Sequence, residues 1–154
     1  MDSPAAAPAR CLALPPMKAT APRVLLIEDN EDDVFLLRRA LMKAQLDVEL
    51  DVIDDGQLAL DYFNRAVVAA QAGNAALPDL VLLDLKLPYV HGLELLAFIR
   101  SRSELKGLTV IVLTSSGEPR DQERAAELGP QGYFVKPPTP ELVAEVSRVL
   151  TARV

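Results

Sequence analysis

Residues 24–33 read VLLIEDNEDD, and the pattern of this stretch is the starting point for predicting the fold. Its first four residues are apolar without interruption, which is typical of a short strand buried on both faces of a sheet. The acidic residues Glu28 and Asp29 follow directly, and Asn30 is a residue type that caps helices. Beyond it, apolar residues recur at helical spacing up to Ala44. The stretch therefore predicts a buried strand, an acidic turn and a helix over 31–44.

The same order of strand and helix recurs four more times along the chain. Further strands are predicted at 46–53, 79–83, 108–113 and 133–135, and further helices at 57–72, 92–102, 120–128 and 139–151. Residues 47–52 alternate between charged and apolar side chains, which favours an edge strand that is solvent-exposed on one face. Because parallel strands need crossover connections, this order predicts an α/β fold in a single domain. We expect a doubly wound (βα)5 flavodoxin-like parallel sheet with strand order 2-1-3-4-5.

Composition limits the classes of protein that the chain can belong to. Half of its 154 residues are apolar and a quarter are charged, as expected of one globular domain over 23–154. Residues 1–22 hold five prolines among many alanines, which predicts a disordered tail. The net charge of −6 argues against nucleic acid as a partner, and no apolar run approaches the ~18 residues of a membrane span. A single cysteine, Cys11, favours a cytoplasmic location.

Polar side chains follow four of the predicted strands. Glu28 and Asp29 end the first strand, Asp84 ends the third, Thr114 the fourth and Lys136 the fifth. The carboxyl ends of parallel strands meet at one edge of the sheet, so three carboxylates are expected close together there. Their mutual repulsion favours a bound cation, and ligands that are all oxygen favour a hard ion such as Mg²⁺. One carboxylate would then be free to act as a nucleophile and form an acyl phosphate, with the lysine and the hydroxyl stabilising the charge.

Other polar residues have simpler interpretations. His91, just before Gly92, is interpreted as a residue that starts the next helix rather than as a ligand or base. The pair 54–55 lies past the edge strand and is interpreted as turn and cap chemistry. Asp32 and Asp33 open the first helix, where the helix dipole favours acidic residues, and a role in tuning the metal site is the alternative.

Four ordered motifs carry a resemblance to a known family. They are VLLIEDN at 24–30, LVLLDLKLP at 80–88 with Gly92 after it, VIVLTS at 110–115 and YFVKP at 133–137. Over roughly 23–150 the chain resembles bacterial response-regulator receiver domains of two-component systems. By this resemblance Asp84 is the phosphoacceptor. The implied ligands of Mg²⁺ (or Mn²⁺) are Glu28, Asp29, Asp84 and the backbone carbonyl of Lys86.

The resemblance also assigns the residues around the phosphoryl group. Thr114 and Lys136 match the residues that hold its oxygens, and the small Ser115 leaves room for them. Tyr133 matches the aromatic partner of the hydroxyl in the conformational switch. The bond from Lys136 to Pro137 resembles one that is typically cis in this family.

The implied partners are proteins of the same signalling system. A sensor histidine kinase, or a phosphotransfer protein, would supply the phosphoryl group. The stretch 64–78 is longer than usual, and it resembles the small receivers that partner phytochrome-type kinases and that tend to be dimers; an elongated exposed helix and loop is the alternative. The chain stops at Val154 after the last helix, so we expect it to act through another molecule rather than as an enzyme, beyond assisting its own phosphorylation and dephosphorylation.

Three other classes remain to be weighed. A phosphohydrolase with an aspartyl phosphate would need a second Asp two residues after the nucleophile, where this chain has Lys86. A flavin-binding electron carrier would need a hydroxyl- and glycine-rich phosphate loop after the first strand, where this chain is acidic over 28–33. A receiver-like binding module that is never phosphorylated is the third, and the complete set of pocket residues argues against it.

Overall fold

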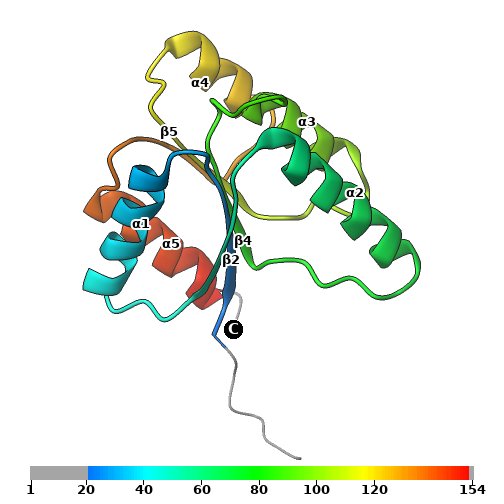
Figure 1. Ribbon diagram of the computed structural model, residues 1–154, viewed down its shortest axis with the longest axis horizontal. Helices are drawn as coiled ribbons and strands as arrows, with labels where there is room; N and C mark the ends of the chain where they lie inside the picture. The colour runs from blue at the N-terminus through cyan, green and yellow to red at the C-terminus, as the bar shows by residue number, and fades with distance from the viewer. Residues whose placement is uncertain (1–20, 153–154) are drawn as a thin grey trace, which may run out of the picture.

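Five parallel strands alternate with five helices in the computed structural model, which describes residues 21–152 (Figure 1). The strands are β2 (Arg23–Ile27), β3 (Glu49–Ile53), β4 (Leu80–Leu83), β5 (Val110–Thr114) and β6 (Gly132–Val135). The helices are α1 (Glu31–Lys43), α2 (Gly56–Gln71), α3 (Gly92–Ser101), α4 (Pro119–Ala126) and α5 (Pro140–Ala152). The tail predicted at 1–22, with Cys11, lies outside the described residues except for its last two.

The strands form one sheet in the order β3-β2-β4-β5-β6. Counted along the chain, this is the predicted order 2-1-3-4-5 of a flavodoxin-like fold, so the fold class is confirmed. The first strand, β2, lies between β3 and β4, with Ile27 in register with Ile53 on one side and Leu83 on the other. The order therefore reverses beside β2, and this reversal places the end of β2 next to the end of β4.

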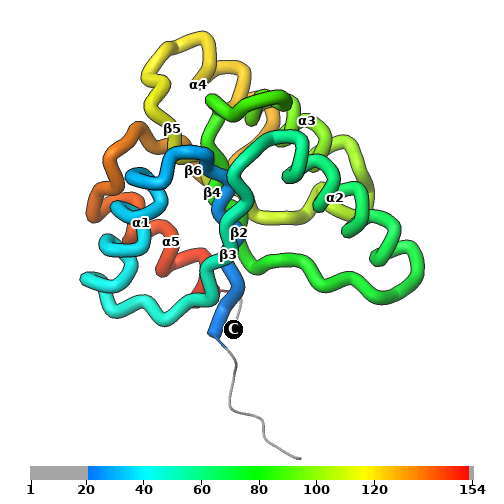
Figure 2. Tube along the Cα trace, viewed as in Figure 1, coloured from blue at the N-terminus to red at the C-terminus, as the bar shows by residue number. Residues whose placement is uncertain are grey.

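Each face of the sheet is covered by its own set of helices. Helices α1 and α5 lie over one face, and α2, α3 and α4 lie over the other (Figure 1 and Figure 2). Side chains along β2 alternate between the two layers: Leu26 packs in the core under α1 and α5, and Leu25 in the core under α2 and α3. This is why the strand reads as an unbroken apolar run.

The predicted element boundaries agree with the structure within two residues, with one exception. Strand β3 starts at Glu49 rather than at Leu46, because the residues directly after α1 form the turn that ends this helix. Gln45 adopts a positive φ of 58°, and the Leu46 amide donates to the Leu41 carbonyl at 3.0 Å. β3 is an edge strand as predicted, with Glu49 and Asp51 exposed. Among residues 21–152, no helix combines the length and apolar character that crossing a membrane requires.

Candidate functional site

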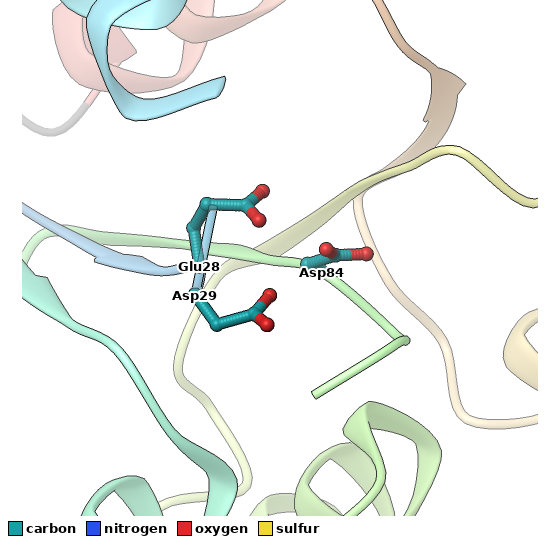
Figure 3. Close-up of side chains that lie close together, drawn as sticks. All are labelled: Glu28, Asp29 and Asp84. Atoms are coloured by element: carbon teal, nitrogen blue, oxygen red, sulfur yellow. The ribbon is translucent and has the colours of Figure 1, made fainter. Parts of the chain in front are cut away.

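Three carboxylates meet at the ends of two adjacent strands. Glu28 and Asp29 follow β2, Asp84 follows β4, and one oxygen from each lies within 4.8 Å of the others. Figure 3 shows the three side chains extending into the same space. Glu28 and Asp84 are buried, whereas Asp29 is exposed. The predicted cluster of acidic residues is thus present, and its geometry follows from the neighbouring positions of β2 and β4.

Glu28 is buried and has two polar partners. Its Oε2 accepts from the Asn30 amide at 3.1 Å, and its Oε1 lies 2.5 Å from Lys136 Nζ. Its pKa is raised to about 7, and burial of the carboxyl group is the largest cause. The hydrogen bond from Lys136 acts to lower this pKa, whereas the negative charge of Asp84 acts to raise it. A buried acidic cluster of this kind favours additional positive charge beside it.

Lys136 supplies one positive charge to the cluster. Its side chain is only 11% exposed, and Nζ lies 2.5 Å from Glu28 Oε1, 2.7 Å from Asp33 Oδ2 and 3.0 Å from Asp84 Oδ2. Burial alone would lower the pKa of Lys136, but the hydrogen bonds to Asp33 and Glu28 and the charge of Asp84 together raise it above its ordinary value. The ammonium group therefore stays charged and spans the ends of three strands and the start of α1.

Asp33 is a contact that the sequence analysis did not specify. It was interpreted as a residue favoured by the helix dipole, with tuning of the metal site as the alternative. In the structure its carboxylate pairs with Lys136. Its place in the acidic run 28–33, in the first turn of the helix that follows the first strand, is the sequence feature that puts it near this edge of the sheet.

A second set of polar residues lies in and around the loop after β5. Thr114 is fully buried, and its Oγ1 accepts from the Ser116 amide at 3.3 Å, while Ser115 is exposed. Ser116 Oγ donates to Asp121 Oδ2 at 2.5 Å, and the Tyr133 hydroxyl donates to the Ser116 carbonyl at 2.8 Å. The predicted switch residues Thr114 and Tyr133 therefore contact the same loop. The roles of Ser116 and Asp121 in linking them were not foreseen.

The remaining predicted residues lie near the cluster or start helices. The Lys86 amide donates to Asp84 Oδ1 at 3.2 Å, and the bond from Lys136 to Pro137 is cis. His91 caps α3, with Nδ1 accepting from the Leu93 amide at 3.1 Å. Asp55 caps α2 in the same way, through the Leu58 amide at 2.7 Å. His91 and Asp55 are thus helix caps, as the sequence indicated.

Fold and geometry together define a class of protein: a doubly wound α/β domain with an acidic cluster and a buried lysine at its topological switch point. The family model of the response regulator receiver domain matches residues 24–147. The chain belongs to this family.

Two curated relatives cover about three quarters of the chain. It is 36% identical over 114 residues to the probable methanogenesis regulatory protein FilR2 of Methanothrix harundinacea, covering 74% of this chain and 71% of that one. It is 34% identical over 113 residues to the response regulator Rcp1 of Synechocystis sp., covering 73% and 75%.

Solved structures with a similar fold include regulators of phytochrome systems. The bacteriophytochrome response regulator RtBRR is 39% identical with a TM-score of 0.70, over 85% of this chain and 78% of that one. The Mn²⁺-bound form of Rcp1 is 32% identical with a TM-score of 0.67, over 83% and 91%. The phosphorylated cyanobacterial phytochrome response regulator RcpA is 31% identical with a TM-score of 0.66, over 87% and 92%.

Proposed function

We propose that this receiver domain accepts a phosphoryl group on Asp84 from a phosphohistidine of a sensor histidine kinase or phosphotransfer protein, with a divalent cation at the acidic cluster. The observation that carries the proposal is the convergence of Glu28, Asp29 and Lys136 on the Asp84 carboxylate. Asp84, like Glu28, both belongs to the group of carboxylates that could hold the cation and contacts the Lys136 ammonium group. A group transferred to it would meet positive charge from both sides.

The donor set fits a hard cation. All three side-chain ligands offer oxygen, and their oxygens lie close enough to share one ion. Mg²⁺ or Mn²⁺ would be held by Glu28, Asp29 and Asp84, with the Lys86 backbone carbonyl as a further ligand. When bound, the ion neutralises the carboxylates and the charge of the incoming phosphoryl group. The Mn²⁺-bound structure of Rcp1 supports this choice of ion.

The transfer itself requires little of the protein beyond positioning. An Asp84 oxygen attacks phosphorus, a P–O bond forms, and the P–N bond to the donor histidine breaks with its electron pair returning to the imidazole nitrogen. Lys136 Nζ, which starts 3.0 Å from Asp84 Oδ2, donates to a phosphoryl oxygen. Thr114 supplies a hydroxyl to another oxygen, and Ser115 leaves space for it.

The output is a shift between two conformations rather than a catalysed reaction. The phosphoryl group draws the Thr114 side chain toward Asp84 and releases space that Tyr133 enters, which changes the face formed by β5, α4 and β6. In the conformation described, the Tyr133 hydroxyl is bonded to the Ser116 carbonyl. Breaking the hydrogen bond between the Tyr133 hydroxyl and the Ser116 carbonyl is the expected free-energy cost of the conformational change.

The proposed partners belong to a phytochrome-type signalling system. The likeness to RtBRR and RcpA supports a phytochrome-type kinase as the phosphoryl donor. A homodimer formed through the face of β5, α4 and β6 is proposed as the second partner contact. The chain would thus act in the cytoplasm by binding other proteins according to its phosphorylation state.

Intact mass spectrometry tests the phosphoacceptor. The wild-type chain is incubated with acetyl phosphate and Mg²⁺ beside Asp84→Asn, with Asp32→Asn as a control that removes an exposed carboxylate from the start of α1. One phosphoryl group is expected on the wild type and on the control, none on Asp84→Asn, and none when the cation is chelated. Stoichiometric phosphorylation of Asp84→Asn would refute the assignment.

A further inference from the structure

We infer that Asp33 is a positioning residue for the phosphoryl transfer, because it holds the Lys136 ammonium group over Asp84 while the site is loaded. The inference rests on the proposed function and adds a residue to it. Asp33 touches neither the proposed cation ligands nor Asp84 in the described contacts, and it acts only through Lys136.

The argument starts from the three partners of one ammonium group. Lys136 Nζ has three N–H donors, and they meet Glu28 at 2.5 Å, Asp33 at 2.7 Å and Asp84 at 3.0 Å. Two of these partners, Glu28 and Asp84, also belong to the group of carboxylates that could hold a cation. Asp33 is the remaining partner and lies outside that group.

Cation binding and phosphorylation of Asp84 affect the three partners of Lys136 unequally. A divalent cation competes for the Glu28 and Asp84 oxygens, and phosphorylation converts Asp84 into an acyl phosphate, whose carbonyl oxygen accepts less strongly than a carboxylate does. Asp33 is subject to neither change, so its ion pair persists through the reaction. A lysine side chain has four rotatable bonds, and a persistent anchor keeps its ammonium group where a phosphoryl oxygen arrives.

The start of α1 is built to hold Asp33 in place. Asn30 Oδ1 accepts from the Asp32 amide at 2.8 Å and from the Asp33 amide at 3.2 Å, and this cap fixes the first helical turn. The Asn30 amide is in turn bonded to Glu28 Oε2. The cap therefore connects the acidic cluster to the turn that carries Asp33, whose side chain is 29% exposed.

Asp32 provides a matched control. It lies in the same turn, its amide is bonded to the same cap, and its side chain is exposed. Within residues 21–152 its carboxylate forms no ion pair with any lysine or arginine. Asp33→Asn and Asp32→Asn therefore remove equal charge from the same helix end, and only the first removes the contact with Lys136.

The test measures phosphorylation rate against acetyl phosphate concentration by quenched intact mass. In Asp33→Asn the maximal phosphorylation rate is expected to fall about fivefold or more, because the Lys136 ammonium group is no longer oriented. The half-saturating concentration of acetyl phosphate is not expected to rise. Asp32→Asn should keep both values within about twofold. In a Lys136→Met background, Asp33→Asn should cause no further loss, since no ammonium group remains to be positioned.

A second readout separates positioning from metal binding. Mn²⁺ affinity, measured by electron paramagnetic resonance of the free ion, should stay within about twofold of wild type in Asp33→Asn and fall in Asp29→Asn. Equal losses of Mn²⁺ affinity in Asp33→Asn and Asp29→Asn would indicate that Asp33 is a metal ligand and would overturn the inference.

The other outcomes are equally decisive. Equal rates in Asp33→Asn and Asp32→Asn, or an undiminished effect of Asp33→Asn in the Lys136→Met background, would refute the positioning role and leave Asp84 as the phosphoacceptor. A wild-type chain that takes up no phosphoryl group would refute both proposals.

Discussion

At the scale of single residues, the site is a balance between three carboxylates and one ammonium group. Glu28, Asp84 and Lys136 are each largely buried, so none of these charges is well solvated. Removing one member of such a group leaves the others without a partner, and this costs more than the ion pair itself contributes.

Lys136→Met tests this balance. Without a cation the variant should lose about 3 kcal/mol of unfolding free energy, because Glu28 and Asp84 remain buried beside each other. Mg²⁺ should then stabilise the variant more than the wild type, since the ion no longer competes with the ammonium group. Chemical denaturation with and without Mg²⁺ measures both quantities. A Mg²⁺ response no greater than that of wild type would contradict the proposed sharing of ligands.

Asp29→Asn tests the metal site with less disturbance, because Asp29 is exposed. Mg²⁺ should raise the melting temperature of the wild type, and chelation should reverse the rise, since an ion that binds only the folded state stabilises it. Most of this rise should be absent in Asp29→Asn and retained in Asp32→Asn. A thermal melt followed by circular dichroism decides between them; a full response in Asp29→Asn would exclude Asp29 as a ligand.

At the scale of elements, one arginine joins the ends of several. The Arg100 guanidinium, on α3, donates to four carbonyls, those of Lys106, Leu108, Leu128 and Gly129, at 2.8 to 3.1 Å. The first two belong to the segment before β5, and the other two to the segment that follows α4. The contact therefore holds the helical layer of that face to the sheet.

Arg100→Ala should lower the free energy of unfolding by about 2 kcal/mol, because two partly buried acceptors, the carbonyls of Leu108 and Leu128, and two exposed ones lose a charged donor at once. Arg148→Ala on α5 is the control: Arg148 is 60% exposed and pairs with Glu145 on the surface, so its loss should cost much less than the loss of Arg100. Equilibrium urea unfolding gives both values. Equal costs for the two variants would mean that the four carbonyls are satisfied by water.

At the scale of the whole molecule, the loop after β4 brings the sheet edge, α2 and α3 together. A Cβ on Gly92 would lie 2.3 Å from the Asp84 carbonyl oxygen, so only glycine fits where α3 starts. The Gly56 amide, at the start of α2, donates to the Pro88 carbonyl of the same loop at 3.0 Å. Close backbone packing thus fixes the loop next to Asp84.

Gly92→Ala is expected to cost more than about 2 kcal/mol of stability and to slow phosphorylation, because the backbone around Asp84 must shift. Gly107→Ala, where an added Cβ meets nothing within 4 Å, should leave the phosphorylation rate unchanged. Urea unfolding and the acetyl phosphate assay measure the two effects. A Gly92→Ala variant with wild-type stability and rate would show that this loop yields without affecting the site.

The fold class, the strand order and the three strand-end carboxylates could all be predicted from the amino-acid sequence. These follow from local patterns: unbroken apolar runs mark strands buried on both faces, and parallel order places their carboxyl ends at one edge. The charged alternation of 47–52 likewise predicted the edge position of β3, although the helix end at Gln45 and Leu46 shortened the strand.

The side chains that meet across elements could not be predicted and are known from the folded structure. Lys136 and Asp33 are 103 positions apart, and Tyr133 and the Ser116 carbonyl are 17 apart. The Arg100 contacts depend in the same way on how α3 lies against two loops. No periodicity encodes such pairs, because the direction of a side chain depends on how its helix packs on the sheet and on the rotamer that this packing leaves open. The strand ends determine where the chemistry lies, and the packing determines which groups support it.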